Sequence, residues 1–200
     1  PAVLNPAPGE WEWQGRGAHN PHYFDDMRRA LERHNVRVMP VFALAARWQR
    51  RPVDRRLHSP GEQQHAYPLD IGAMVDSWRG IYDRWSDPIT SIEIYNEPSG
   101  TVEDRLGPLI HAMAYGFSGR QDGDRPLIGG PGFAGGVRRR LISALGRMGA
   151  LNVMDYLSFH TYADPKNIES LVRGYRDALK PYGLETMEIR LSESGDKFVG

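Results

Sequence analysis

The sequence predicts an α/β fold, a parallel sheet with helices outside it, because short apolar segments alternate with amphipathic helical segments along the chain. The strand-like segments have few charges in their middle, which is typical of parallel strands buried on both faces. Alternation of this kind favours either a doubly wound sheet or a (β/α)8 barrel. The five expected strands are 36–44, 91–97, 125–131, 154–162 and 185–194.

The first expected helix covers 21–35, because Asn20 and Pro21 form a good N-cap and first-turn pair, and Phe24 and Met27 begin a helical apolar spacing. Thr101 and Asp104 resemble a capping box before the third helix. Asn167 is expected to cap the last one. The later helices are expected at 70–85, 105–117, 136–148 and 168–180.

The amino-acid composition excludes some classes of binding partner and some kinds of site. The chain has 200 residues, which is ample for one domain with a core. Lys plus Arg equals Asp plus Glu at 25 each, so no global charge bias favours nucleic acid or a membrane as partner. The absence of cysteine excludes disulfides and thiolate metal sites. No apolar run approaches the length of about 18 residues that a membrane span needs. The cellular compartment stays open between secreted or periplasmic and cytoplasmic.

Polar side chains stand where several expected strands end, and both candidate architectures place their sites at the carboxyl ends of strands. The segment IEIYNEPSG, 92–100, passes from a β-branched run directly into Asn96, Glu97 and Pro98, and proline stops a strand. A dinucleotide site would need G-x-G-x-x-G after the first strand. GGPGFAGG follows the third and is broken by Pro131. No cofactor is therefore expected.

Two glutamates end two different expected strands, Glu97 in IEIYNEP and Glu193 in ETMEIRLSES. Over one barrel mouth such a pair would converge. Cleavage of a glycosidic bond requires this pair, because one carboxylic acid protonates the leaving oxygen while the other attacks the anomeric carbon or activates water. A single glutamate at a strand end is more often a capping or surface residue, so the argument depends on the pair.

Several local sequences resemble the retaining glycoside hydrolases of clan A, whose fold is a (β/α)8 TIM barrel. The matching segments are EIYNEP (93–98), IGGPG (128–132), DYLSFHTY (155–162) and SESGDKFVG (192–200). They are most similar to family 39, which includes β-xylosidases, α-L-iduronidases and hydrolases of bacterial exopolysaccharides. The resemblance runs over nearly the whole chain and implies a carbohydrate substrate.

The resemblance also implies residue roles. Glu97 would be the general acid/base, protonated at rest, and Glu193 the ionised nucleophile. Asn96 would donate to the sugar 2-hydroxyl. His160 and Tyr162 would line the subsite, with Tyr162 able to hydrogen-bond the nucleophile. For these last two, a satisfied core histidine and a packing tyrosine remain alternatives.

The loop after the first expected strand, ARWQRRPVDRRLHSP, carries further candidates for substrate binding. Trp48 is a candidate stacking platform for a sugar, and core packing is the alternative. Arg47 and Arg50 are expected on the active-site side, where guanidinium groups pair well with carboxylate or sulfate. The hypothesis is an anionic, for instance uronate-containing, polysaccharide. A solvated basic loop is an equally good interpretation.

A complete barrel has eight strands and typically about 250 residues, whereas this chain shows five. We expect 1–200 to be one catalytic-barrel segment, from the loop after strand 2 of a barrel through strand 7. The isolated segment is expected to lack part of its pocket, so that it can be inactive by itself. The alternative is a noncatalytic carbohydrate-binding or scaffold module. A metal-dependent hydrolase is disfavoured because the sequence lacks H-x-H and H-E-x-x-H spacings, so no metal is expected.

Overall fold

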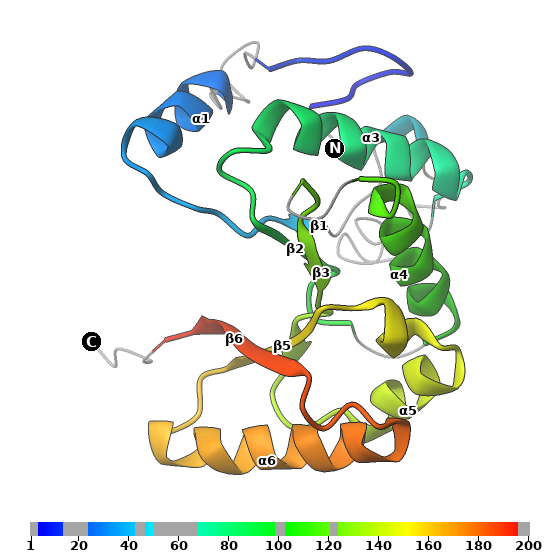
Figure 1. Cartoon of the computed structure of the whole chain (residues 1–200), viewed down its shortest axis with the longest axis vertical. Helices are drawn as coiled ribbons and strands as arrows, with labels where there is room; N and C mark the ends of the chain where they lie inside the picture. Colours follow the sequence, from blue (N-terminus) through cyan, green and yellow to red (C-terminus); the bar gives the residue numbers. More distant parts are fainter. Residues whose placement is uncertain are drawn as a thin grey trace, which may run out of the picture. The chain divides into compact units, whose positions relative to one another are not determined.

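The structure is a computed structural model that describes residues 4–13, 24–42, 47–49, 68–98, 103–120 and 124–195. The chain forms two compact units (Figure 1). Unit 1 comprises Pro1–Thr90 and Gly116–Pro126, and unit 2 comprises Ser91–Tyr115 and Leu127–Gly200. Each unit has its own buried core.

Unit 1 contains helix α1 (Phe24–Arg33), strand β1 (Val41–Phe42), the 3-10 turn η1 (Arg47–Gln49) and helix α3 (Ile71–Trp85). The buried face of α3 packs aromatic rings, with Trp78 lying 5.3 Å from Phe42 between ring centroids. Tyr82 meets Phe117 edge to face at 5.3 Å. The first expected strand is thus reduced to a short β1 in the described residues.

Of the two helix starts in unit 1, that of α3 shows its cap. Asp70 caps α3, its carboxylate accepting the Ala73 backbone N–H at 3.0 Å. Asn20 and Pro21, the expected start of the first helix, lie outside the described residues. The expected helices 21–35 and 70–85 correspond to α1 and α3, and the buried, largely apolar face of α3 has the helical period.

Unit 2 holds a parallel sheet made of β2 (Ser91–Ile94), β3 (Leu127–Gly129), β4 (Phe133–Ala134), β5 (Tyr156–Thr161) and β6 (Glu188–Ser194). Both β3 and β4 pair with β5, at Gly129–Tyr156 and Phe133–Phe159. They are therefore two parts of one strand path, interrupted at 130–132. The order β2, β3/β4, β5, β6 follows the chain, and it confirms four of the expected strands.

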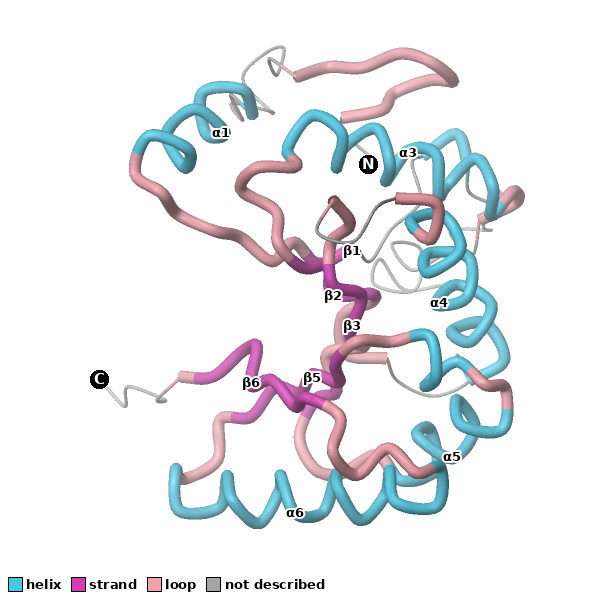
Figure 2. Tube along the Cα trace, in the orientation of Figure 1, coloured by secondary structure: helices cyan, strands magenta, loops and turns pink. Residues whose placement is uncertain are grey.

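The helices of unit 2 alternate with these strands (Figure 2). They are α4 (Glu103–Phe117, its last residues in unit 1), α5 (Arg139–Arg147) and α6 (Ile168–Leu179), with 3-10 turns η2 (Ala150–Val153), η3 (Pro165–Asn167) and η4 (Lys180–Tyr182). One expected cap is wrong. Asn167 occupies the N-cap position of α6 without a side-chain hydrogen bond, and Asp164 instead caps η3 by accepting from Lys166 N–H at 3.0 Å.

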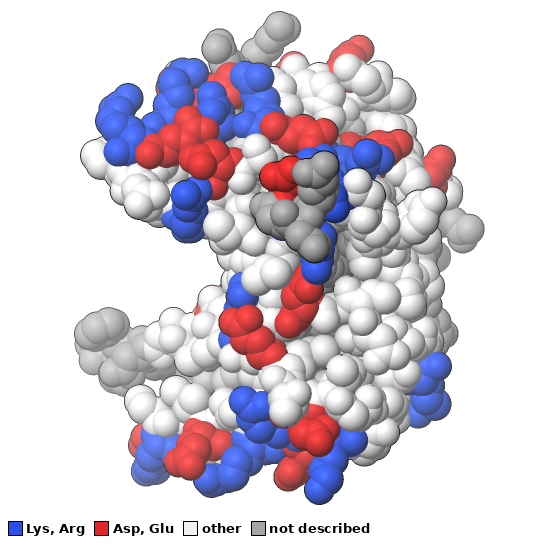
Figure 3. Space-filling view, viewed as in Figure 1, with Lys and Arg blue, Asp and Glu red and all other residues white. Residues whose placement is uncertain are grey.

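The core of unit 2 lies between the sheet and the buried faces of α4, α5 and α6. Tyr175 of α6 packs on Phe159 of β5 at 5.1 Å and on Phe133 of β4 at 6.1 Å between ring centroids. Burial raises the pKa of Tyr175 to about 12, as expected for a phenol that loses hydration. The outer face of α6 mixes charges of both signs, including the pair Arg173–Glu169, and is a solvated surface (Figure 3).

Among the helices in the described ranges, none combines the length and apolar character that crossing a membrane requires.

Candidate active site

The end of β2 has an unusual backbone conformation, which hydrogen bonds to the neighbouring strand path hold in place. Tyr95 and Glu97 have φ angles of 74° and 46°, a region that residues other than glycine adopt at some energetic cost. The Glu97 N–H donates to Gly132 O at 2.9 Å, and the Gly132 N–H donates to Tyr95 O at 3.1 Å. The strand thus stops being regular before Asn96, and the neighbouring strand path fixes the position of Glu97.

The β3/β4 strand path can approach the end of β2 closely because its residues at the points of contact are glycines. At Gly130, with φ 98°, an added Cβ would lie 2.9 Å from the backbone N and O of Ile94. At Gly132 it would lie 2.4 Å from His160 Nε2 and 2.7 Å from Glu93 Oε1. The segment 128–132, IGGPG, therefore packs closely between the ends of β2 and β5.

His160, near the end of β5, is the centre of the cluster. It is buried, with 2% of its surface exposed. Its Nδ1 lies 3.0 Å from Glu97 Oε1, in hydrogen-bond contact, and 3.6 Å from Glu193 Oε2. Its Nε2 lies 3.5 Å from Glu93 Oε1. One imidazole thus faces three carboxylates that come from β2, the segment after it, and β6.

A bulge in β6 brings Glu193 to this face. Phe159 pairs with Leu191, but the next residue, His160, pairs with Glu193, so Ser192 is an extra residue on the β6 side. Successive strand residues point to opposite faces, so without the extra residue Glu193 would face away from His160. The bulge is therefore what puts the two side chains side by side.

Tyr162, just beyond β5, donates its hydroxyl to Glu193 Oε1. This hydrogen bond is the main cause of the raised pKa of Tyr162, with desolvation and the charges of Glu193 and Glu97 adding to it. The phenol therefore stays a neutral donor to the carboxylate. Tyr162 is 51% exposed, so it borders the cluster rather than closing it off.

The two strand-end glutamates lie close together and open to solvent. A carboxylate oxygen of Glu97, one of Glu193 and a ring nitrogen of His160 all fall within 4.8 Å of one another. The side chains of Glu97 and Glu193 are 39% and 47% exposed, whereas that of His160 is 3% exposed. A buried imidazole therefore supports two carboxylates that a substrate can reach.

The cluster carries no basic partner apart from the histidine. Among the described residues, no lysine or arginine forms an ion pair with Glu93, Glu97 or Glu193. The separations within the set are also short enough for a cation to bridge. Hydrogen bonds from Tyr162 to Glu193 and between His160 and Glu97 connect the residues of this set without a cation.

Of the residues named from the sequence, Glu97, Glu193, His160 and Tyr162 come together, and Asn96 lies beside them with its backbone paired to Gly132. The other candidates fall in unit 1 or outside the described residues. Trp48, in unit 1, donates its indole N–H to Asn5 O and Oδ1, both at 3.2 Å. Arg47 belongs to η1, and Arg50 lies outside the described residues.

Sequence reasoning missed the part played by Glu93. Glu93 shares the strand alternation of Glu97, which predicts an inward, polar interior position and no part in the site. The structure instead places it against His160 Nε2. The signal that could have found it is the combination of an inward carboxylate on one strand with an inward histidine at a strand end close by.

Solved structures share this fold. One is a psychrophilic family 10 endo-β-1,4-xylanase, with TM-score 0.58, 13% identity, 98% of this chain covered and 64% of that one. Another belongs to a study of two fungal β-1,4-galactanases, with TM-score 0.58, 14% identity and coverages of 96% and 59%. A third is a protein from Neocallimastix frontalis, with TM-score 0.55, 19% identity and coverages of 92% and 45%.

What these likenesses establish is the fold. The chain has an α/β fold of parallel strands and helices, similar to the fold of these TIM-barrel structures. It spans less than two thirds of the length of each of these structures. No family model matches the sequence, and a search of curated proteins found no match either.

Proposed function

We propose that this chain carries the catalytic residues of a retaining glycoside hydrolase of clan A, most similar to family 39. One observation carries the proposal: carboxylate oxygens of Glu97 and Glu193, from two different strand ends, lie within 4.8 Å of each other. Retaining enzymes hold their two carboxyl groups about 5–5.5 Å apart, whereas inverting enzymes need roughly 6.5–9.5 Å to admit a water. The short separation supports direct attack by a carboxylate.

In the first half of the reaction, Glu193 attacks the anomeric carbon while Glu97 gives its proton to the glycosidic oxygen. The bond between that oxygen and the anomeric carbon breaks, the leaving sugar departs as an alcohol, and a glycosyl ester to Glu193 forms. In the second half, Glu97, now a carboxylate, takes a proton from water as the water attacks the same carbon. The ester bond breaks, Glu193 is released, and two inversions give net retention.

The neighbouring side chains suit these roles. Tyr162 donates to Glu193 and so orients the oxygen that does not attack. His160 contacts Glu97 and holds its carboxyl group toward the space shared with Glu193. Asn96, next to Glu97 at the pinned end of β2, is placed to donate to the sugar 2-hydroxyl, a hydrogen bond that strengthens in the transition state.

A polysaccharide is the substrate class that we favour, because two of the fold neighbours are described as a β-1,4-xylanase and β-1,4-galactanases. The arginine-rich loop with Arg47 and Arg50 motivates the narrower hypothesis of an anionic chain. Trp48 stays a candidate stacking platform by sequence, although its indole N–H is engaged by Asn5 in unit 1.

A noncatalytic carbohydrate-binding or scaffold module is the second candidate. It shares the carbohydrate ligand with the first proposal but leaves the proximity of Glu97 and Glu193 without a role. Such a module would bind oligosaccharides without cleaving them.

The test is hydrolysis of a panel of nitrophenyl glycosides (β-xyloside, β-glucoside, β-galactoside, α-L-arabinofuranoside and β-glucuronide) by the full chain. Proton NMR gives the anomeric configuration of the first product. Turnover with retained configuration is the expected result. Turnover with inversion contradicts the mechanism. Inactivity on every glycoside, together with calorimetric binding of xylo- or galacto-oligosaccharides, would establish the module instead.

A further inference from the structure

Glu93, in the middle of β2, is a buried carboxyl group whose hydrogen-bonding capacity is unused. Its exposed fraction is 0%. Neither of its carboxyl oxygens has a hydrogen-bond partner among the described residues. Buried polar groups in proteins are nearly always paired, and a carboxyl group without a partner is costly to keep, so this one calls for an explanation.

His160 is a polar group that could pair with Glu93. Its Nε2 lies 3.5 Å from Glu93 Oε1, just outside a normal hydrogen bond. Gly132 encloses this contact, since a Cβ there would collide with both atoms, at 2.4 Å from Nε2 and 2.7 Å from Oε1. The backbone thus leaves space for the two side chains to face each other and for little else.

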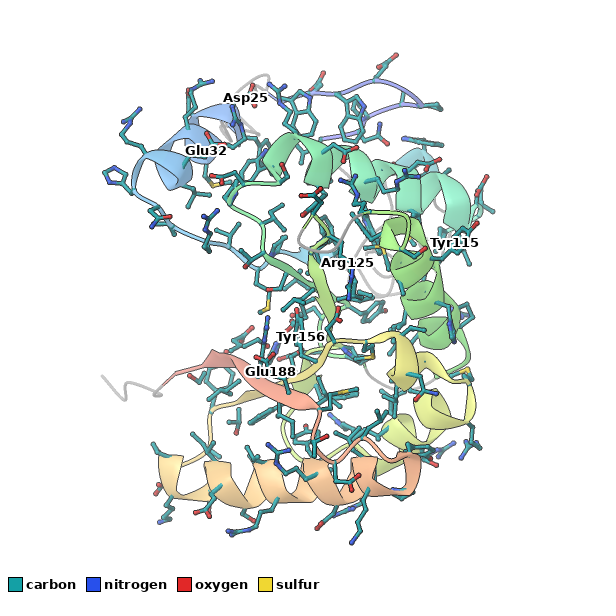
Figure 4. The ribbon with its side chains drawn as sticks, in the orientation of Figure 1. Asp25, Glu32, Tyr115, Arg125, Tyr156 and Glu188 are labelled. Carbon is teal, nitrogen blue, oxygen red and sulfur yellow. The ribbon has the colours of Figure 1, made fainter. Side chains whose placement is uncertain are left out.

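Other groups near Glu93 have partners of their own. Tyr156 of β5 donates its hydroxyl to Ile92 O at 2.8 Å. Arg190 of β6 lies over the Tyr156 ring and pairs with Glu188 on its own strand. Figure 4 shows Tyr156 and Glu188, which are register partners, close together on β5 and β6. Among the described residues, the ionisable groups within ion-pair distance of the His160 ring are Glu93, Glu97 and Glu193.

A neutral imidazole carries its proton on one nitrogen and a lone pair on the other, and the hydrogen bond made by one nitrogen decides the state of the other. We propose that Glu93 is a positioning residue that accepts the Nε2–H of His160 and so turns the Nδ1 lone pair toward Glu97. This inference rests on the proposed role of Glu97 as the acid.

The consequence concerns the proton of Glu97. A lone pair on Nδ1, 3.0 Å from Glu97 Oε1, is satisfied only if Glu97 is the donor, with its carboxyl group protonated. Glu97 is then loaded with the proton that the leaving oxygen needs. After that proton has gone, the lone pair faces a carboxylate, which favours recovery of a proton from the attacking water. His160 keeps its own proton throughout.

The direct test is the tautomer of His160 in the full chain, uniformly labelled with nitrogen-15 and measured near neutral pH. Two-dimensional spectra that correlate ring nitrogens with ring protons distinguish protonated from unprotonated nitrogens, and His160→Asn assigns the signals. The expected result is a neutral ring with the proton on Nε2. A proton on Nδ1, or on both nitrogens, would overturn the proposal.

Variants link the tautomer to Glu93. Glu93→Gln keeps an acceptor oxygen and should keep the Nε2–H tautomer. Glu93→Leu, which cannot accept, and Gly132→Ala, which pushes the two groups apart, should both lose it. Glu169→Gln on the exposed face of α6 is the matched control. An unchanged tautomer in folded Glu93→Leu and Gly132→Ala proteins would contradict the inference.

Activity gives a second readout. If Glu93 acts through the acid function of Glu97, Glu93→Leu should lower kcat/KM by about tenfold or more for glycosides with poor leaving groups and spare dinitrophenyl glycosides, which need no proton. Equal losses on both would indicate only structural damage and reject the proposal. The tautomer needs no substrate, so a chain that is inactive but shows the Glu93-dependent tautomer would refute the proposed function and not this inference.

Discussion

Two regions of the molecule hold carboxylates in opposite ways. In unit 1, Asp25 of α1, labelled in Figure 4, is 6% exposed and is matched by Arg84 of α3, whose Nε and a terminal nitrogen donate to its two oxygens at 2.9 Å and 2.5 Å. This pairing holds the pKa of Asp25 below its usual range, the hydrogen bond from Arg84 being the largest cause. Both oxygens of the carboxylate are satisfied.

In unit 2, three carboxyl groups surround one imidazole, and no described arginine or lysine pairs with any of them. Like charges at such distances oppose one another, so the arrangement does not serve stability. The comparison teaches how to separate a structural carboxylate from a functional one: a guanidinium neutralises the first, whereas the second is left with neighbours that control its proton.

The largest expected effect is on turnover. Glu193→Gln removes the proposed nucleophile and Glu97→Gln removes the proposed proton donor, and we expect each to lower kcat/KM by about 100-fold or more on glycosides with poor leaving groups. Melting temperatures should not fall, because each change relieves crowding of acidic groups. Glu169→Gln is the control. Full activity in either variant would contradict the catalytic role proposed for that glutamate.

The reverse pattern is expected for Asp25→Asn. Loss of the paired charge should lower the free energy of unfolding at neutral pH by about 1–2 kcal/mol, less than for a fully buried pair because Arg84 is 41% exposed. A carboxyl group with a lowered folded pKa contributes stability above its unfolded pKa of about 3.9 and loses it as the pH falls through the folded value. Denaturant titrations of variant and parent should therefore converge in acid.

Asp26→Asn is the matched control for that measurement. Asp26 is the neighbour of Asp25, and its partner Arg29 and its own side chain are 50% and 63% exposed, so the change should be close to neutral. Equal losses of stability in the two variants would show that the pairing of Asp25 with Arg84 contributes no more than the exposed pair of Asp26 with Arg29.

A smaller effect is expected for Tyr162→Phe. The variant keeps the ring and removes the donor to Glu193, and a hydrogen bond to a partly exposed charged group should be worth about tenfold in kcat/KM. Tyr115→Phe, on a tyrosine of α4 that is 84% exposed, is the control. If Tyr162→Phe matches the control, the contact with Glu193 has no part in catalysis.

Arg47→Ala and Arg50→Ala test the anionic substrate. We expect each to reduce kcat/KM a few-fold on a uronate-containing glycan, with a weaker dependence on salt, and to leave neutral glycans unaffected. Arg173→Ala on α6 is the control. Identical rates and salt dependence on the acidic glycan would reject the anionic hypothesis.

The smallest expected effect is that of chelation. If proton transfers by Glu97 and attack by Glu193 suffice, EDTA followed by buffer exchange should leave kcat/KM unchanged. A loss that added zinc or manganese restores would mean that the cluster of Glu97, His160 and Glu193 binds a cation instead.

Much of this arrangement was predictable from the sequence, since apolar segments placed β2, β5 and β6 and helical periodicity placed α3, α4 and α6. What the sequence lacked was local backbone geometry. The bulge at Ser192 adds one residue and reverses which face Glu193 occupies. The positive φ of Glu97 and the close approach of Gly132 depend on pairing between segments far apart in the chain, so neither shows in a local pattern.

The most direct test of the central claim is covalent trapping of the nucleophile. The chain is incubated with a set of 2-deoxy-2-fluoro glycosyl fluorides (xylosyl, glucosyl and galactosyl). The fluorine at C2 slows both formation and breakdown of the glycosyl ester, whereas the good fluoride leaving group speeds its formation, so the ester accumulates. Peptide mapping by mass spectrometry then locates the sugar. The account predicts one added sugar, on Glu193. A sugar on any other residue, or turnover with inverted configuration and no labelled peptide, would contradict it.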